Sequence, residues 1–200
     1  GAHSATTYLI EQGHRRIGFI TGAMDQICAQ DRLEGYKSAL AEDAIPFDTD
    51  LVFEGDFFQP LGYQGASVLL ELADRPTAIF ASNDVSAFGV MEAVRDHNLR
   101  IPQDVSVVGF DDIPQAAHVH PALTTVRQPL EEMGRVATQM LLEYITDPER
   151  AIERVQANKE RVEKLHERVV HLPVAEVLDA PSSHVLQCPA AGQCPDTAAV

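Results

Sequence analysis

Polar and aromatic side chains suited to binding a polyol follow four short apolar segments of the sequence. Arginine, asparagine and aspartate donate or accept hydrogen bonds, and aromatic rings stack on the apolar face of a sugar ring. A pocket for such a ligand needs few but well-aimed polar groups. In chain order the candidates are Asp25, Gln26, Arg32, Asp56, Phe57, Phe58, Ser82, Asn83, Asp84, Asp111 and Asp112.

Patterns typical of catalytic sites are missing from the sequence. It contains neither a Gly-x-Ser-x-Gly elbow nor a Gly-x-x-x-x-Gly-Lys phosphate loop. Asp111 and Asp112 are sequence neighbours, which does not give the separation that the two carboxylates of a glycosidase need. His118 and His120 have no obvious third metal ligand beside them. We therefore expect no catalytic residue, no metal ion and no cofactor.

Several candidates have a plainer structural explanation, which the sequence leaves open. Asn83 and Asp84 begin a predicted helix, so either one is a possible N-cap. Asp111 and Asp112 fit a turn. Arg32 fits an exposed position on a helix.

The elements that must position these residues alternate between short apolar strands and helices. Strands are predicted at 16–20, 51–53, 78–81, 105–110 and 123–126, and helices at 5–12, 31–42, 60–73, 84–97 and 130–145. Strands that are apolar on both faces and separated by helices are typical of a parallel sheet covered on both sides. Ligands bind beyond the carboxyl ends of such strands. The loops after Ile20, Glu54, Ala81 and Phe110 are therefore expected to meet along one edge.

Charge and cysteine content limit the classes of partner. Thirty acidic against 15 basic residues give a net charge of −15, which phosphate backbones repel, so these 200 residues are a poor nucleic-acid binder by themselves. Three cysteines do not make a disulfide framework and fit a reducing compartment. Cys188 and Cys194 lack the further ligands that a zinc site needs. With no apolar run of ~20 residues and no signal peptide, we expect a cytoplasmic protein without membrane contact.

Six segments, in this order, resemble segments of LacI/GalR-type (lactose-repressor-type) transcriptional regulators. They are 13–20 (GHRRIGFI), 32–36 (RLEGY), 55–57 (GDF), 75–84 (RPTAIFASND), 101–112 (IPQDVSVVGFDD) and 123–129 (LTTVRQP). The resemblance covers about residues 1–148 and implies a ligand-sensing domain of a DNA-binding repressor that lacks its helix-turn-helix head.

The resemblance also implies the fold, which is α/β with a doubly wound, mainly parallel sheet of the periplasmic-binding-protein-like type I. One subdomain is expected to be complete and the other only partly present. Residues 1–122 correspond to the C-terminal effector-binding subdomain, and 123–148 to a crossover strand and helix that belong to the N-terminal subdomain in the family.

In this family comparison, Arg32, Asn83 and Asp111 hydrogen-bond the hydroxyl groups of a small-molecule effector, most simply a sugar, while Phe57 stacks on it and Gln26 adds a contact. A homodimer is implied in the intact protein, with the helix 85–97 and the segment after residue 112 near the interface. Operator DNA would be bound only through the head. With one wall of the cleft present, weak or absent sugar affinity is expected for the chain alone.

The C-terminal part departs from the family pattern. We expect a charged helical insert at 149–167, a residual strand at 168–179 and a disordered tail at 180–200, and we interpret the chain as a fragment or a degraded gene product. The alternative function is a periplasmic-type sugar-binding protein of a transport system, which needs a signal peptide. An enzyme on a similar sheet would need a nucleophile–base pair, and the sequence indicates none.

Overall fold

The computed structural model describes residues 1–146 and 185–187 of the chain. The chain divides into two compact units, Gly1–Arg127 with Pro173–Gln187, and Gln128–Leu172 with Cys188–Val200, and each unit is described here by itself. The predicted insert at 149–167 and the predicted strand at 168–179 lie outside the described residues.

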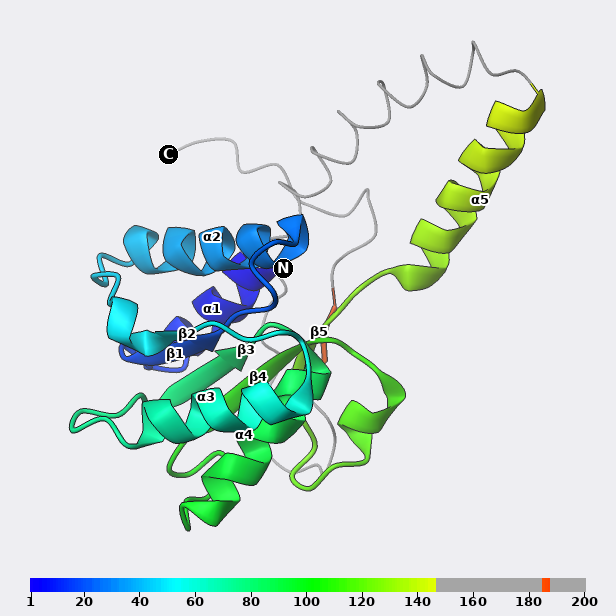
Figure 1. The fold of residues 1–200 in the computed structure, drawn as a ribbon. Coiled ribbons are helices and arrows are strands. Elements are labelled where there is room, and N and C mark those ends of the chain that lie inside the picture. Colours follow the sequence, from blue (N-terminus) through cyan, green and yellow to red (C-terminus); the bar gives the residue numbers. More distant parts are fainter. Residues whose placement is uncertain (147–184, 188–200) are drawn as a thin grey trace. The chain divides into compact units, whose positions relative to one another are not determined.

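A six-stranded sheet forms the centre of the first unit (Figure 1), and its strands are ordered β2-β1-β3-β4-β5-β6. Every neighbouring pair is parallel. The strands are β1 (Ile17–Ile20), β2 (Val52–Phe53), β3 (Ala78–Ala81), β4 (Ser106–Asp111), β5 (Thr124–Arg127) and β6 (Val185–Gln187). The chain moves to one side of β1 for β2 and to the other side for β3, so the predicted doubly wound α/β fold is confirmed.

Two apolar clusters cover the two faces of this sheet. The helices of the unit are α1 (Ala2–Glu11), α2 (Ile27–Glu42), α3 (Gln59–Leu70) and α4 (Asp84–Asp96), with short 3-10 helices η1 (Thr49–Leu51) and η2 (Pro114–Ala117). Phe19 and Phe80 share a cluster with side chains of α1 and α2, whereas Ile20 and Ile79 pack with those of α3 and α4. Neighbouring strand residues thus face opposite helix pairs, which explains why the strands are apolar throughout.

Three of these helices end in the same way. The residue after the C-cap has a left-handed φ in α1, α2 and α4: Gly13 (φ 93°), Ala44 (φ 54°) and Asn98 (φ 56°). The next amide then bonds back into the last turn: His14 to Leu9 (3.1 Å), Ile45 to Leu40 (2.8 Å) and Leu99 to Val94 (3.0 Å). This pattern is the Schellman motif, which satisfies carbonyl groups that the helix leaves unpaired.

The starts of the strands form an edge that we call the amino edge, and the ends of the strands form the carboxyl edge. His14 forms hydrogen bonds at the amino edge: its two ring nitrogens lie 2.8 Å from Thr77 Oγ1 and 3.0 Å from Ser106 Oγ. Burial lowers the pKa of His14. The neutral ring therefore ties the entries to β3 and β4 together.

Most element bounds lie within a few residues of those that the sequence predicts, and for two elements the difference has a clear local reason. Helix α2 begins at Ile27 rather than Asp31. The sequence did not indicate this start, because the N-cap residue Gln26 is not a typical capping residue and makes no side-chain cap hydrogen bond. The strand predicted at 51–53 keeps only Val52–Phe53, because Leu51 ends the 3-10 helix η1.

The predictions for 180–200 and for the boundary at residue 122 need correction. Residues Val185–Gln187 form β6 and pair with β5, so the expected disordered tail contains a strand. The high content of Pro, Ser, Ala and Gly in this region predicted disorder and masked one short apolar segment. That segment pairs through its backbone with β5. The first unit extends to Arg127 rather than residue 122, since β5 continues the parallel sheet.

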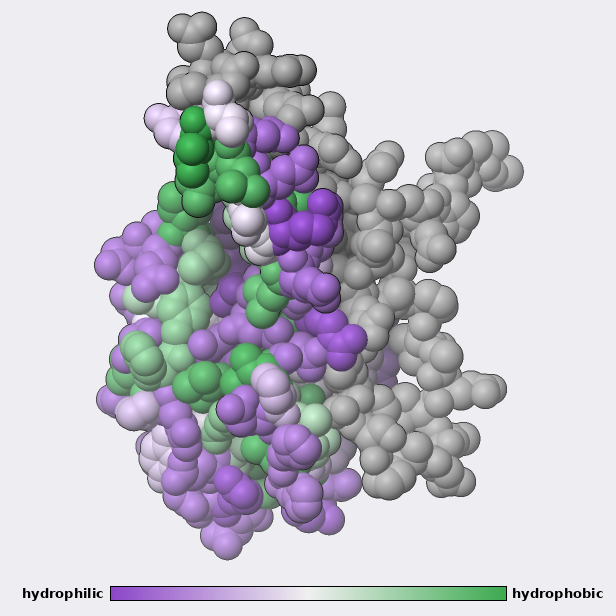
Figure 2. All heavy atoms as spheres, turned by 90° about the vertical axis from the view of Figure 1, so that its right-hand side faces the viewer, coloured by the Kyte–Doolittle hydropathy of each residue, from purple (hydrophilic) through white to green (hydrophobic). Residues whose placement is uncertain are grey.

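Helix α5 (Leu130–Thr146) is the described part of the second unit, close to the range predicted. None of its residues is buried. Its exposed large apolar side chains are Leu130, Met133, Leu141, Leu142, Tyr144 and Ile145. Figure 2 shows a group of apolar side chains (green) in the upper part of the face that it draws. Among the described residues, no helix is both long and apolar enough to cross a membrane.

Candidate ligand-binding site

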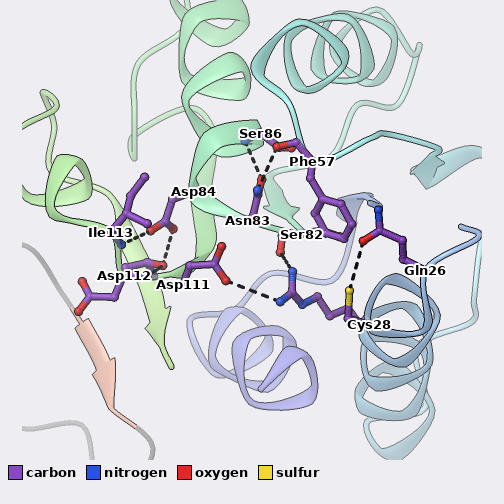
Figure 3. Close-up of polar contacts among 12 residues, drawn as sticks. Gln26, Cys28, Phe57, Ser82, Asn83, Asp84, Ser86, Asp111, Asp112 and Ile113 are labelled. Atoms are coloured by element: carbon purple, nitrogen blue, oxygen red, sulfur yellow. Dashed lines mark hydrogen bonds and ion pairs between the residues drawn. The ribbon is translucent and has the colours of Figure 1, made fainter. Parts of the chain in front are cut away.

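Four segments that follow neighbouring strands meet at the carboxyl edge (Figure 3). Arg32 comes from α2, Phe57 from the loop after β2, Asn83 directly follows β3 with Ser82, and Asp111 ends β4. Because the strands are parallel and in register, their ends bring these segments together although the residues are far apart in the sequence. The geometric prediction that Arg32, Phe57, Asn83 and Asp111 lie side by side is therefore met.

The side chain of Arg32 joins two of the strand ends. Its Nη1 donates to the carbonyl oxygen of Ser82 at 2.6 Å, and its Nη2 lies 3.6 Å from Oδ1 of Asp111. The guanidinium side chain is only 14% exposed. An exposed helix position, the plainer explanation of this residue, is therefore excluded.

Two aromatic rings lie close to the same guanidinium group. Cζ of Arg32 lies 4.1 Å from the centre of the Phe110 ring and 5.5 Å from the centre of the Phe57 ring. A cation over a ring face is stabilised by the ring quadrupole, more strongly where water is excluded. Burial lowers the pKa of Arg32, and the carboxylate of Asp111 acts in the opposite direction. These contacts fix the direction in which Arg32 points.

Phe57 occupies its place because Gly22 leaves room for it. A Cβ atom on Gly22 would lie 1.9 Å from the Phe57 ring, well inside van der Waals contact. The backbone of Phe57 is left-handed (φ 73°), which is uncommon for a bulky residue. Nδ2 of Asn83 donates to the Phe57 carbonyl oxygen at 3.0 Å and holds this conformation.

Asn83 is the N-cap of α4, as the plainer reading of this position allowed. Its Oδ1 accepts from the amide of Ser86 at 2.9 Å, while its Nδ2 bonds to Phe57. One N–H of the amide group is not used in these two bonds. The side chain therefore caps a helix and braces the neighbouring loop at the same time.

Asp84 is fully buried and does not cap the helix. Its Oδ2 accepts from the amide of Ile113 at 2.9 Å, and its Oδ1 accepts from Oγ1 of Thr125 at 2.5 Å. Burial raises the pKa of Asp84 to about 6, although these two hydrogen bonds oppose the shift. Figure 3 shows the carboxyl group of Asp84 beside Ile113.

The turn after β4 contains two successive left-handed residues, Asp111 (φ 116°) and Asp112 (φ 58°). Asp112 forms an ion pair with Arg127 at the end of β5, and its amide donates to Thr125 Oγ1 at 3.3 Å. Left-handed non-glycine residues outside helix ends are strained and persist where surrounding contacts hold them. Asp111 is the last residue of β4 and Asp112 follows it, so the turn predicted for these two residues stays a prediction.

Gln26 lies at the N-cap of α2 and is exposed. Its Oε1 accepts from Sγ of Cys28 at 3.8 Å. The contacts of Gln26 in the described part of the chain do not join it to the Arg32 cluster, so its role stays a prediction.

Two participants were missed in the sequence, Phe110 and the carbonyl group of Ser82. Adjacent strand residues normally face opposite sides, so Phe110 and Asp111 are not expected to meet one partner. The left-handed φ of Asp111 ends this alternation, which lets Arg32 contact both. A backbone carbonyl leaves no signal in the sequence.

Comparison with known proteins places this architecture in a family. Residues 6–164 match the family described as periplasmic binding protein-like domain. The HTH-type transcriptional repressor PurR of Vibrio atlanticus is 36% identical over 179 residues, 90% of this chain and 51% of the relative. The ribose operon repressor of Haemophilus influenzae is 43% identical over 148 residues, 74% of this chain and 45% of the relative.

The solved structure of the transcriptional regulator CelR in complex with cellobiose superposes with a TM-score of 0.71 at 40% identity, covering 73% of this chain and 45% of that one. The chain spans about half the length of the curated relatives it matches. These relatives are transcriptional regulators, which does not favour the transport-protein alternative. The crystal structure of a regulatory protein of the LacI family from Chloroflexus aggregans also superposes, with a TM-score of 0.71 at 36% identity, covering 74% of this chain and 53% of that one. The chain therefore belongs to the periplasmic binding protein-like domain family, in the form that LacI-family transcriptional regulators contain.

Proposed function

We propose that this chain is the effector-sensing domain of a transcriptional repressor and that its effector, a sugar, binds at the carboxyl edge. The supporting observation is Arg32 of α2, which bonds to Ser82 and pairs with Asp111. Its guanidinium group also lies close to the rings of Phe57 and Phe110. The hydroxyl groups of a sugar both donate and accept hydrogen bonds, so a guanidinium donor next to a carboxylate acceptor suits them. The aromatic ring can stack on the apolar face of the sugar.

In this proposal the roles of the five predicted residues remain those that the sequence suggested. Arg32, Asn83 and Asp111 bond hydroxyl groups, Phe57 stacks, and Gln26 contributes from the rim. The complex of one similar regulator with cellobiose and the name of the ribose operon repressor support a sugar as the effector class.

Regulation then follows from linkage, since an effector that prefers one conformation shifts the population towards it. Operator DNA would be contacted by a helix-turn-helix head, because the net charge of −15 opposes contact by these 200 residues. A homodimer through α4 and the segment after Asp112 and a cytoplasmic location belong to the same proposal. Sedimentation of the chain over a concentration series tests the dimer.

The effector proposal is tested by a thermal-shift panel of ribose, cellobiose and common hexoses on this chain. A bound effector raises Tm by mass action, by an amount that grows with its concentration. Because weak affinity is expected when one wall of the cleft is present, the sugars are tested up to high concentration, where even weak binding raises Tm. We expect one or more sugars to raise Tm in the unsubstituted chain and not in Arg32→Ala. A sugar that raises the Tm of both proteins equally binds elsewhere, and a panel without any response rejects sugar sensing by this chain.

A further inference from the structure

The buried carboxyl group of Asp84 holds the backbone that carries Asp111. The amide of Ile113 donates directly to Asp84 Oδ2. The amide of Asp112 donates to Thr125 Oγ1, which in turn donates to Asp84 Oδ1. Both amides that follow Asp111 therefore end on one carboxyl group, the second through a hydroxyl.

The fit around this carboxyl group is tight. A Cβ atom on Gly109 would lie 2.3 Å from Asp84 Oδ1, so β4 passes directly against the carboxyl group. Asp84 itself is fully buried. Water therefore has little access to replace a lost bond, and the bonds to Ile113 and Thr125 determine where the turn lies.

We propose that Asp84 is a positioning residue whose ionised carboxyl group holds the Asp111–Asp112 turn in place, and whose protonation releases that turn. The inference rests on the proposed function only in taking Asp111 as part of the effector site. An ionised carboxylate accepts both hydrogen bonds at full strength, whereas a protonated one becomes a donor at one oxygen. Protonation must therefore weaken at least one of the two bonds.

The charged groups facing Asp84 favour titration near neutral pH. Asp111 and Asp112 on the turn both raise the pKa of Asp84 by repulsion, in addition to burial, which brings it to about 6. From β5 the facing group is the neutral hydroxyl of Thr125, and from β4 it is Gly109.

The two helices next to this carboxyl group add no nearby ionised side chain. The residues that follow Asp84 in α4, Val85 to Ala87, are uncharged. Tyr63 is the one titratable side chain of α3, and its hydroxyl donates to Asp96 at the far end of α4. A small acidification thus shifts Asp84 between its ionised and protonated states.

Nuclear magnetic resonance on the 15N- and 13C-labelled chain tests this inference without any ligand. Between pH 7.5 and 5 we expect the carboxyl carbon of Asp84 and the amide of Ile113 to titrate with one midpoint near 6. The exchange protection of the Ile113 amide should fall on the acid side. A failure of this experiment leaves the effector proposal untouched, because no effector is present.

Arg100 provides a matched internal control. Its amide donates to Oδ2 of Asp104 at 2.8 Å, again from backbone to carboxylate, but hydrogen bonds from Arg100 lower the pKa of Asp104 to about 2. The Arg100 amide should therefore not titrate between pH 7.5 and 5. Asp84→Asn should fix the chemical shift of the Ile113 amide across this range, which assigns the titration of that amide to Asp84.

Two outcomes overturn the inference. One is an Asp84 carboxyl group that titrates near 3.8, its ordinary value, and the other is an Ile113 amide that stays unchanged while Asp84 titrates. If Asp84→Asn does not fold, the titration of the unsubstituted chain decides alone. Once a sugar is found to bind, its affinity should be about tenfold weaker at pH 5 than at pH 7, and independent of pH over this range in Asp84→Asn.

Discussion

The two edges of the sheet use left-handed backbone for different purposes. Near the amino edge, Gly13, Ala44 and Asn98 are left-handed because each follows a helix and completes a Schellman motif. At the carboxyl edge, Phe57 and Asp111 are left-handed without ending a helix. Their conformations instead direct a ring and a carboxylate towards Arg32.

The edges also differ in how their polar groups are satisfied. Arg16 at the amino edge pairs with exposed or half-exposed partners, Asp48 and Asp74, and bonds to them directly. Arg32 at the carboxyl edge is less exposed than Arg16, and its guanidinium group lies close to the rings of Phe110 and Phe57. Strain together with a buried cation is typical of functional sites, whereas the amino edge serves stability. We therefore expect the carboxyl edge to bind the effector and the amino edge to stabilise the fold.

Replacing each arginine by alanine should give the largest contrast. Arg32→Ala removes the donor to the Ser82 carbonyl and the guanidinium group beside Asp111, so sugar affinity should fall about 10- to 100-fold. Arg16→Ala removes the bond to Asp48 and should lower Tm without changing sugar affinity. Isothermal calorimetry with the sugar from the panel, together with thermal unfolding, measures both. Equal losses of affinity in the two variants would remove the distinction between the edges.

Two glycine-to-alanine substitutions separate a steric clash at the carboxyl edge (Gly22) from backbone strain at the amino edge (Gly13). Gly22→Ala forces the Phe57 ring away, at a cost of about 1–3 kcal/mol, and should abolish the sugar-induced rise in Tm. Gly13→Ala meets no atom within 4 Å but keeps a φ of 93°, so it should cost about 1–2 kcal/mol and leave the sugar response intact. Urea unfolding gives the costs. A Gly22→Ala variant with normal sugar binding would show that Phe57 is not needed there.

A buried hydroxyl group at the amino edge allows a smaller test. The hydroxyl of Tyr36 donates to the carbonyl oxygen of Ile17 at 2.8 Å, where β1 begins. Tyr36→Phe removes this bond and should cost about 1 kcal/mol in urea unfolding, with sugar binding unchanged. Tyr63→Phe is the matched control, since the Tyr63 hydroxyl bonds to Asp96 at the surface and its loss should be within experimental error.

Acidification should affect the two edges in opposite directions, as the smallest of these effects. The folded chain disfavours the charged form of His14, so stability is lost as the pH falls below about 6.5, the ordinary value of histidine. Asp84 binds its proton more tightly in the folded chain, so it adds stability as the pH falls from about 6 towards 3.8.

Urea unfolding between pH 7.5 and 5 resolves these two contributions. Asp84→Asn should make the chain lose more stability on acidification than the unsubstituted chain, because it removes a favourable contribution. His14→Gln should make it lose less. The reverse order would contradict both assignments.

The sequence predicts the sheet well because its strands carry uninterrupted apolar runs, as at 78–81, where prediction and structure coincide. It also predicts the grouping of Arg32, Phe57, Asn83 and Asp111, because parallel strands must end at one edge. The start of α2 was missed since Gln26 gives no cap signal.

Contacts made by backbone groups or by unusual torsion angles could not be predicted. The position of Phe110 against Arg32 depends on the φ of Asp111, which no residue type encodes. The bonds of Asp84 to Ile113 and Thr125 depend on how closely β4 and β5 approach α4. Such features follow from packing in three dimensions rather than from local patterns.

The uncovered apolar side of α5 has a practical consequence for anyone who handles the protein. Six large apolar side chains between Leu130 and Ile145 face water, Ile145 with 68% of its surface. Contiguous surfaces of this kind adsorb hydrophobic dyes and promote precipitation as concentration or sulfate is increased. Preparations of these 200 residues should therefore store best when dilute and in low salt, and dye fluorescence should fall when leucines on α5 are replaced by glutamate.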